Sequence, residues 1–139
     1  MGQEKSPRVS VGAVVFRGAE VLLIKRGKPP WLGQWSIPGG GLHYGETLIE
    51  AVAREVCEET TCAVRVTGLI DVFEAMPGPD YAFPHTVMVD YACEWVSGEP
   101  IAGDDAAAAE FVAIEEAKAR LSWDETRRAL AMALKMRAI

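Results

Sequence analysis

The stretch that decides the fold is Gly40–Cys62, GGLHYGETLIEAVAREVCEETTC, in which Glu55, Glu58 and Glu59 stand at i, i+3 and i+4. On a helix this spacing places all three side chains on one face, with neighbouring Cβ atoms about 5–6 Å apart. Like charges at that spacing repel, and the end of a helix already carries roughly half a negative charge from its dipole. Because carboxylate oxygens are ligands of hard cations, the trio predicts a divalent ion, Mg²⁺ first and Mn²⁺ as the alternative.

A helix over residues 47–60 is the clearest element in the sequence. The pattern T-x-x-E at residues 47–50 is a capping box, which predicts the helix start. The apolar residues that follow lie on one side at helical spacing: Leu48, Ala51 and Val52. Glu55 continues that apolar stripe, so the acidic trio is expected to be half-sheltered. An unpaired carboxylate is strongly disfavoured there without a counter-ion. The alternative is a solvated acidic helix face.

Valine-rich and alternating stretches predict strands on both sides of this helix. Strands are predicted at 9–16, 20–25, 62–74, 85–96 and 110–114, and the tail from 115 onward is predicted to be helical. Segment 26–36 is predicted to be a loop because Gly and Pro interrupt it, and a glycine-rich run at 37–41 can approach a ligand closely. The pattern predicts one α/β domain over residues 1–139.

Composition limits the partners of the chain. Half of the 139 residues are apolar, which is enough for a real core, and the formal net charge is −6. A net negative chain lacks the basic footprint that nucleic-acid binding requires. No apolar run approaches the ~18 residues of a membrane span, and the first residues lack the apolar core of a signal peptide. We therefore expect a cytoplasmic protein with a small-molecule partner, without nucleic acid or membrane; a homodimer is compatible with the apolar content.

The spacing of the polar residues resembles the Nudix box, G-x₅-E-x₇-R-E-U-x-E-E-x-G-U, in which U is a bulky apolar residue. Six of the fixed positions match: Gly40, Glu46, Arg54, Glu55, Glu58 and Glu59. Thr61 stands where the family has a glycine that would end the helix in the left-handed conformation, and Cys62 is a small substitute for the last apolar residue. The box spans residues 40–62, and the stretch 35–40 is similar to its approach. The resemblance implies an α/β/α sandwich with a mixed β-sheet.

The same resemblance implies an enzyme that hydrolyses the pyrophosphate of a nucleoside diphosphate linked to another group. Segments 85–91, 95–100 and 103–106 are similar to ADP-ribose pyrophosphatases of the family, so ADP-ribose, cleaved to AMP and ribose 5-phosphate, is the first-choice substrate. One alternative is cleavage of a nucleoside triphosphate, including an oxidised one, with release of pyrophosphate. Another is a nucleotide-binding module without turnover.

Each box residue then has an expected role. The expected metal ligands are the side chains of Glu55, Glu58 and Glu59 and the carbonyl of Gly39. The expected catalytic residues are Glu55, Glu58, Arg54, Glu46 and Asp104. Arg54 would orient one of the glutamates by a bidentate contact, and Glu46 would support that network or reach a second metal. The base stays open between a box glutamate and the acids of a later loop, with Asp104 before Asp105 and Glu110.

Substrate contacts are expected from Arg26, Trp35, Tyr44 and Gly40. Aromatic rings able to stack on a base are those of Trp31, Tyr44, Tyr81 and Phe83, and phosphates could meet Lys25, Arg26 and Lys28. The structural alternative is that Trp31 or Trp35 packs under the loop and that Arg26 ends a solvent-facing strand.

Overall fold

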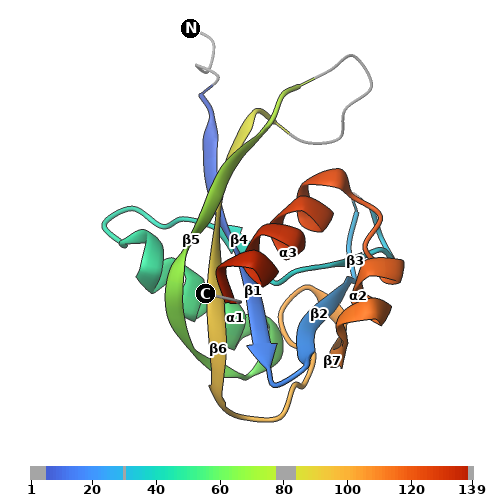
Figure 1. Cartoon of the computed structure of the whole chain (residues 1–139). Helices are drawn as coiled ribbons and strands as arrows, with labels where there is room; N and C mark the ends of the chain where they lie inside the picture. The colour runs from blue at the N-terminus through green and yellow to red at the C-terminus, as the bar shows by residue number, and fades with distance from the viewer. Residues whose placement is uncertain (1–5, 30, 78–83, 138–139) are drawn as a thin grey trace, which may run out of the picture.

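The structure, a computed structural model, describes residues 6–29, 31–77 and 84–137. A mixed seven-stranded sheet lies at its centre, formed by β1 (Arg8–Arg17), β2 (Glu20–Arg26), β3 (Trp35–Ser36), β4 (Gly39–Gly41), β5 (Ala63–Ala75), β6 (Thr86–Ser97) and β7 (Ala106–Ala113). The helices are α1 (Leu48–Thr60), α2 (Ile114–Arg120) and α3 (Asp124–Arg137). Helix α1 lies on one side of the sheet and α3 on the other (Figure 1). This arrangement is the predicted α/β/α sandwich.

Strand β1 is the strand on which the rest of the sheet is arranged. It pairs in parallel with β6 and antiparallel with β2 and with β4. The registers place Gly12 of β1 opposite Gly39 of β4 on one side and opposite Asp90 of β6 on the other. Residues of the glycine-rich run and of β6 therefore lie in one row across the sheet.

The side chains of β1 alternate between two cores, as expected for a strand that is covered on both faces. The residues that face α1 are Val11, Ala13 and Val15, which pack with Ala51, Val52 and Val56 of the helix. The residues that face α3 are Val14 and Phe16, which pack with Ala129, Leu130 and Ala133. Burial of these apolar side chains on both faces fixes the position of α1 against the sheet.

The start of α1 confirms the capping-box prediction. Thr47 is the N-cap: its side chain accepts a hydrogen bond from the Glu50 backbone N–H at 3.1 Å, and the Glu50 carboxylate accepts one from the Thr47 N–H at 2.9 Å. These two bonds satisfy N–H groups that a helix start leaves without partners.

The end of α1 keeps the left-handed geometry although a threonine replaces the family's glycine. Thr61 has φ 62°, and its hydroxyl donates a hydrogen bond to the Glu99 carbonyl at 2.9 Å. The following loop docks on the helix end, because the N–H groups of Ile101 and Gly103 donate to the carbonyls of Thr60 and Glu59. The loop thereby satisfies helix-end carbonyls and brings residue 104 to the acidic end of α1.

Four parts of the secondary structure differ from the sequence-based prediction. The predicted loop at 26–36 contains the short strand β3, and the glycine run forms β4. A Cβ atom at Gly39 would lie 2.2 Å from the Val11 carbonyl oxygen, so the glycine allows β4 to pair closely with β1. Strand β7 begins at Ala106, earlier than residue 110, because pairing with β2 compensates for the low strand preference of its alanines. The helical tail is divided into α2 and α3 near Leu121.

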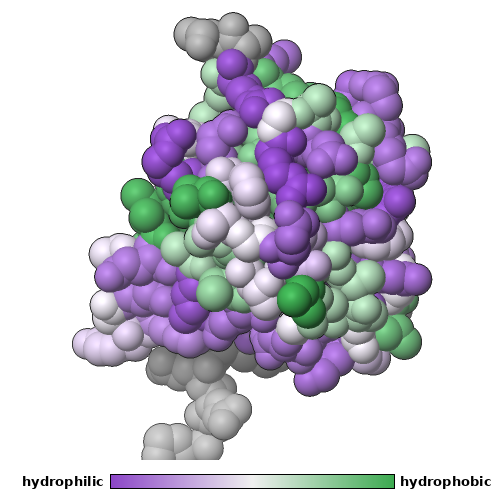
Figure 2. All heavy atoms as spheres, turned by 90° about the horizontal axis from the view of Figure 1, so that it is seen from below, coloured by the Kyte–Doolittle hydropathy of each residue, from purple (hydrophilic) through white to green (hydrophobic). Residues whose placement is uncertain are grey.

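The surface is mixed in character. In the view from below, hydrophilic residues cover most of the face and hydrophobic residues form small separate groups (Figure 2). None of the helices in the described part of the chain has the length and apolar character needed to cross a membrane.

Candidate active site

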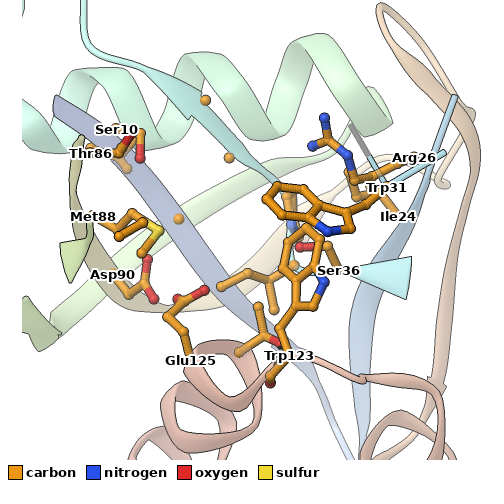
Figure 3. Close-up of a pocket in the computed structure, with 18 of the residues that line it drawn as sticks. Ser10, Ile24, Arg26, Trp31, Ser36, Thr86, Met88, Asp90, Trp123 and Glu125 are labelled. Atoms are coloured by element: carbon orange, nitrogen blue, oxygen red, sulfur yellow. Dashed lines mark hydrogen bonds between the residues drawn. The ribbon is translucent and has the colours of Figure 1, made fainter. Parts of the chain in front are cut away.

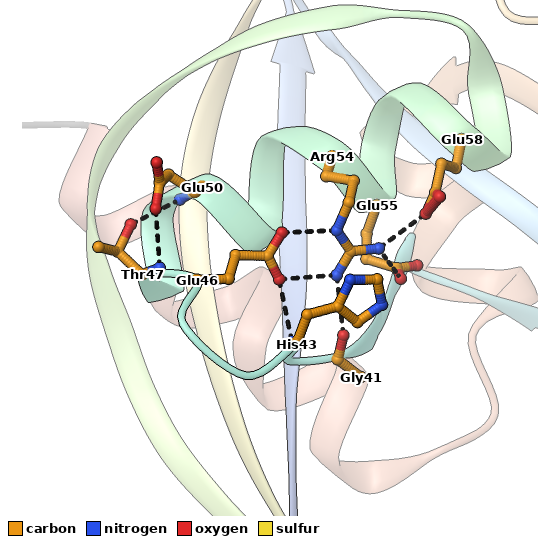
Figure 4. Close-up of polar contacts among 8 residues, drawn as sticks. All are labelled: Gly41, His43, Glu46, Thr47, Glu50, Arg54, Glu55 and Glu58. Carbon is orange, nitrogen blue, oxygen red and sulfur yellow. Dashed lines mark hydrogen bonds and ion pairs between the residues drawn. The ribbon is translucent and has the colours of Figure 1, made fainter.

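Arg54 is the centre of the polar network on α1 (Figure 4). Its Nε and Nη2 donate to the two carboxylate oxygens of Glu46 at 2.6 and 2.9 Å, a bidentate pair. Its Nη1 donates to Glu55 Oε1 at 2.8 Å and to Glu58 Oε1 at 2.7 Å. Its Nη2 also donates to the Gly41 carbonyl. Arg54 therefore contacts three glutamates, where the sequence predicted that it would orient one of them.

Glu46 fixes the position of Arg54. Its hydrogen bonds with the guanidinium, and with the backbone N–H of His43 at 3.0 Å, lower its pKa to about 2. In turn, Glu46, Glu55 and Glu58 raise the pKa of Arg54 above its ordinary value. Glu46 is thus ionised at neutral pH and holds a permanently charged guanidinium against the acidic face of α1.

Glu55 lies against β4 (Gly39–Gly41), which we call the glycine strand. A Cβ atom at Gly40 would be 2.3–2.6 Å from the Glu55 carboxylate atoms, so only a glycine leaves room for that carboxylate at β4. Burial raises the pKa of Glu55, and the nearby Arg54 opposes this shift. The close fit explains why the β4 residue that lies against the Glu55 carboxylate is a glycine.

Glu59 is the most sheltered acid of the trio. It is 7% exposed, and its Oε1 accepts a hydrogen bond from the backbone N–H of Gly39 at 2.8 Å. Burial raises the pKa of Glu59 to about 8, and the charges of Glu55 and Asp104 act in the same direction. A cation beside this carboxyl would favour its ionised form.

These residues fit a hard cation by their chemistry. Glu55, Glu58 and Glu59 offer only oxygen atoms, and two of them are buried carboxyls with raised pKa values. Within residues 6–29, 31–77 and 84–137, no three His, Cys, Asp or Glu side chains are already arranged as a finished metal site. Arg54 bridges Glu55 and Glu58 in this structure, so their carboxylates would have to turn toward a shared ion.

The acids of the later loop have different surroundings. Asp104, with φ 52°, lies close enough to α1 for its charge to raise the pKa of both Glu55 and Glu59. Asp105 forms an ion pair with Lys28 at 2.7 Å, and Glu110 forms one with Arg120. Of these three acids, Asp104 is the one that the loop brings to the acidic helix face.

A cavity of about 520 Å³ opens beside the acidic helix face and contains two groups of residues (Figure 3). One group, from β2, β4 and α1, consists of Arg26, Gly39, Gly40 and Glu59. The other consists of Trp31, Asp90, Trp123 and Glu125; Trp31 lies beside Arg26, and the two carboxyl groups lie opposite the indole rings (Figure 3). The structure therefore brings the predicted residues Arg26 and Gly40, and the candidate stacking ring of Trp31, to one cavity.

Two predicted substrate contacts have other surroundings. The Trp35 ring lies under the Arg120 guanidinium, 4.6 Å from its carbon, and packs against the core on the α3 side. Tyr44 is fully exposed in the loop before α1. Neither residue is part of the cavity wall, and for Trp35 this arrangement is the packing alternative. Tyr81 and Phe83 lie outside the described residues.

Asp90, Trp123 and Glu125 line the cavity but were not among the residues predicted from the sequence. A signal existed for Asp90, because it is the one charged residue in the otherwise apolar and aromatic run from 87 to 93 of a buried strand. Trp123 and Glu125 reach the cavity only through the packing of α3 on the sheet, which no local pattern encodes.

Comparison with known proteins identifies the family to which this fold belongs. A family profile described as the NUDIX domain matches residues 6–133. The chain is 38% identical over 105 residues to an ADP-ribose pyrophosphatase of Methanocaldococcus jannaschii, a match that covers 76% of this chain and 61% of that protein. It is 35% identical over 99 residues to putative 8-oxo-dGTP diphosphatase 2 of Mycobacterium tuberculosis, covering 70% of this chain and 67% of that protein.

A solved structure of a Nudix hydrolase has a similar fold. The crystal structure of a MutT Nudix hydrolase from Burkholderia pseudomallei matches with a TM-score of 0.78 and 31% identity, covering 92% of this chain and 98% of that one. The chain therefore belongs to the Nudix family, as its box predicted, and Nudix hydrolases generally use divalent metals. It spans about three fifths of the length of the M. jannaschii relative.

Proposed function

We propose that the chain is a metal-dependent pyrophosphohydrolase of a nucleoside diphosphate derivative, with ADP-ribose as first-choice substrate and AMP and ribose 5-phosphate as products. The observation that carries this proposal is the contact of two helix glutamates with β4, whose glycines line a cavity together with Glu59. Glu55 lies against Gly40, Glu59 is hydrogen-bonded to Gly39, and Glu58 is held beside Glu55 by Arg54. The similarity to an ADP-ribose pyrophosphatase supports the choice of substrate.

Four groups would hold the divalent ion: the carboxylates of Glu55, Glu58 and Glu59 and the carbonyl of Gly39. Mg²⁺ is first choice and Mn²⁺ the alternative, because all four donors are oxygen. When bound, such an ion stabilises charge on phosphoryl oxygens and lowers the pKa of a bound water. Glu59 stays next to the glycine strand through its hydrogen bond with the Gly39 N–H.

The remaining residues position these groups. Arg54, anchored by Glu46, sets the directions of Glu55 and Glu58. Gly40 leaves the space that the Glu55 carboxylate occupies. Arg26 lines the same cavity and offers a guanidinium to substrate phosphate. Asp104, at the edge of the acidic face, or a box glutamate such as Glu58 would accept the proton of the attacking water.

A second candidate reaction is hydrolysis of a nucleoside triphosphate, including an oxidised one, with release of pyrophosphate. The similarity to the M. tuberculosis protein favours it. The non-catalytic alternative is a module that only binds nucleotide. It would be expected to lack a box glutamate or the arginine, and all of these are present here.

Product analysis tests the proposal. Purified protein is incubated with ADP-ribose and Mg²⁺, and separately with nucleoside triphosphates, and the products are separated by chromatography. We expect AMP from ADP-ribose with wild-type protein, and at least a tenfold lower rate for Glu58→Gln. Glu115→Gln on the exposed part of α2 is the matched control and should keep the wild-type rate. Pyrophosphate from triphosphates without AMP from ADP-ribose would favour the second reaction; background rates in every case would favour the binding module.

A further inference from the structure

Asp90 is a buried acid that the proposed phosphate chemistry does not use. It lies on β6, is 2% exposed, and its Oδ2 has no hydrogen-bond partner among the described residues. A Cβ atom at Gly12 would lie only 2.4 Å from Asp90 Oδ1, so the glycine of β1 leaves room for this carboxyl. A buried polar oxygen without a partner, at the wall of a cavity, is positioned to bind a ligand.

Glu125 at the start of α3 faces Asp90. The two carboxyl groups lie side by side at the cavity wall (Figure 3). Two carboxyls at such close range cannot both ionise easily, so the pair tends to keep one proton. Burial and the neighbouring Glu125 both raise the pKa of Asp90 well above its ordinary value. A pair that shares a proton offers one O–H donor next to carboxylate acceptors.

Two indole rings stand across the cavity from this acid pair. Trp31 and Trp123 contact each other edge to face, with centroids 4.9 Å apart, and both line the cavity opposite the carboxyl groups (Figure 3). Aromatic faces stack on any nucleobase and so provide affinity, whereas hydrogen bonds to the base edge provide selectivity. In a bound flat heterocycle, the indoles would contact the face of the ring and the acid pair would contact its edge.

The position of the acid pair matches the length of a nucleotide. Gly39, Gly12 and Asp90 lie in one row across three adjacent strands. Because neighbouring strands are about 4.8 Å apart, Asp90 lies about 10 Å from the glycine strand where the phosphates would bind. A ribose between phosphate and base spans this kind of gap. A nucleotide bound at the acidic helix would therefore place its base beside Asp90.

We propose that Asp90 and Glu125 recognise the hydrogen-bonding edge of adenine, with the indole of Trp31 or Trp123 stacking on the ring. Adenine presents an amino donor next to a ring-nitrogen acceptor, which is the complement of a carboxylate acceptor next to a carboxyl O–H. Guanine presents two adjacent donors and suits a fully ionised pair instead. This inference rests on the proposed function and gives it a base preference.

The test compares ADP-ribose with inosine diphosphate ribose, in which a keto oxygen replaces the amino group and the ring nitrogen becomes a donor. The measured quantity is the ratio of the two kcat/KM values on the same enzyme preparation, which does not depend on how much of a variant is folded. We expect wild type to prefer ADP-ribose by about tenfold or more. Asp90→Ala and Glu125→Ala should each bring the ratio to within about threefold of one.

Asp90→Asn should keep most of the preference, because an amide also offers one donor and one acceptor. Asp124→Ala, on the same turn of α3 as Glu125 and with a highly exposed side chain, is the matched control and should leave the ratio unchanged. A wild-type ratio near one, an inverted ratio, or a ratio that both alanine variants leave unchanged would overturn the proposal.

Failure of the proposed function is distinguishable from failure of base recognition. If neither compound is hydrolysed in Mg²⁺, the function is wrong, and calorimetric titration of the full chain with AMP and with IMP then measures base recognition alone. Tighter binding of AMP by about tenfold, lost in Asp90→Ala, would support the acid pair as an adenine site. Equal binding of AMP and IMP, or binding of neither, would overturn it.

Discussion

Arg54 shows how charge is balanced at the scale of single residues. The acidic trio predicted a divalent ion as its neutralising partner, but the chain itself supplies a guanidinium that bridges Glu55 and Glu58. The sequence predicted a bidentate contact for Arg54, and that contact is with Glu46. The choice among partners could not be predicted, because it depends on which rotamers of long side chains the glycine strand leaves open.

Replacing Arg54 with lysine tests this positioning role. Lysine keeps the positive charge but loses the planar fork that reaches Glu46, Glu55 and Glu58 together. We expect kcat/KM for ADP-ribose to fall by about tenfold or more in Arg54→Lys, with circular dichroism unchanged. Arg128→Lys, at an exposed position on α3, is the control. Equal kcat/KM in wild type and Arg54→Lys would show that a positive charge at position 54 is enough for activity without the guanidinium fork.

Thr61 carries a backbone conformation that favours glycine. The left-handed conformation costs a residue with a Cβ atom roughly 1–2 kcal/mol, and the hydrogen bond from the Thr61 hydroxyl to Glu99 offsets part of this cost. Thr61→Ala loses the bond and keeps the strain, whereas Thr61→Gly loses both. We expect Thr61→Gly to be more stable than Thr61→Ala by about 1 kcal/mol in urea unfolding. The reverse order would contradict the left-handed end of α1.

Glu59 links the stability of the metal-free protein to pH. Its pKa is raised from 4.5 to about 8, so the folded chain holds this proton more tightly than the unfolded chain. The favourable contribution of Glu59 to the free energy of unfolding is complete below about pH 4.5 and is lost as pH rises through about 8. We expect the free energy of unfolding in EDTA to fall over this range, in the same direction as the effects of Glu55 and Asp90, whose pKa values are also raised.

The matched variant for this pH effect is Glu59→Gln. Its free energy of unfolding should fall less between pH 5 and pH 8 than that of the wild type. Urea unfolding of both proteins in EDTA measures it. Added Mg²⁺ should stabilise the wild type most at the alkaline end, because binding requires the ionised carboxyl. The same slope in wild type and Glu59→Gln would show that Glu59 does not hold its proton in the fold.

At the scale of elements, the sequence predicted those parts that carry a local signal. The capping box correctly predicted the residue at which α1 starts. Valine-rich alternation predicted β1 and β6, with small errors at their ends. Strands β3 and β4 were missed because their signal is not local. Segments as short as Trp35–Ser36 and Gly39–Gly41 become strands only when β2 and β1 supply the hydrogen-bond partners.

The glycine strand makes a paired prediction. At Gly40 a methyl group would meet the Glu55 carboxylate, whereas at Gly41 no atom lies within 4 Å of the added Cβ. We expect Gly40→Ala to displace Glu55 and to lower kcat/KM for ADP-ribose by about tenfold or more, while Gly41→Ala stays near wild type. Mg²⁺-dependent hydrolysis by the two variants measures the difference. Equal rates would show that the contact between β4 and α1 does not matter for activity.

At the scale of the whole molecule, the site combines groups from distant parts of the chain. The candidate acids come from α1, the docked loop adds Asp104, and β6 and α3 contribute Asp90 and Glu125 to the cavity. The sequence predicted Gly40 and the glutamates of α1 as candidate site residues, because they fall within one motif. It could not predict the part of the cavity that Asp90 and Glu125 line, because these two residues meet only after α3 packs on the sheet. The homodimer and the cytoplasmic location stay predictions.

The position of a divalent ion in a crystal tests the proposed metal site on α1 and β4 directly. Crystals of the wild-type chain grown or soaked with Mn²⁺ give an anomalous difference map, which locates manganese without reference to the surrounding atoms. We expect a peak bounded by the carboxylates of Glu55, Glu58 and Glu59 and by the carbonyl of Gly39, with Arg54 turned away from at least one glutamate. Glutamates still joined to Arg54, with no peak between them at millimolar Mn²⁺, would contradict it.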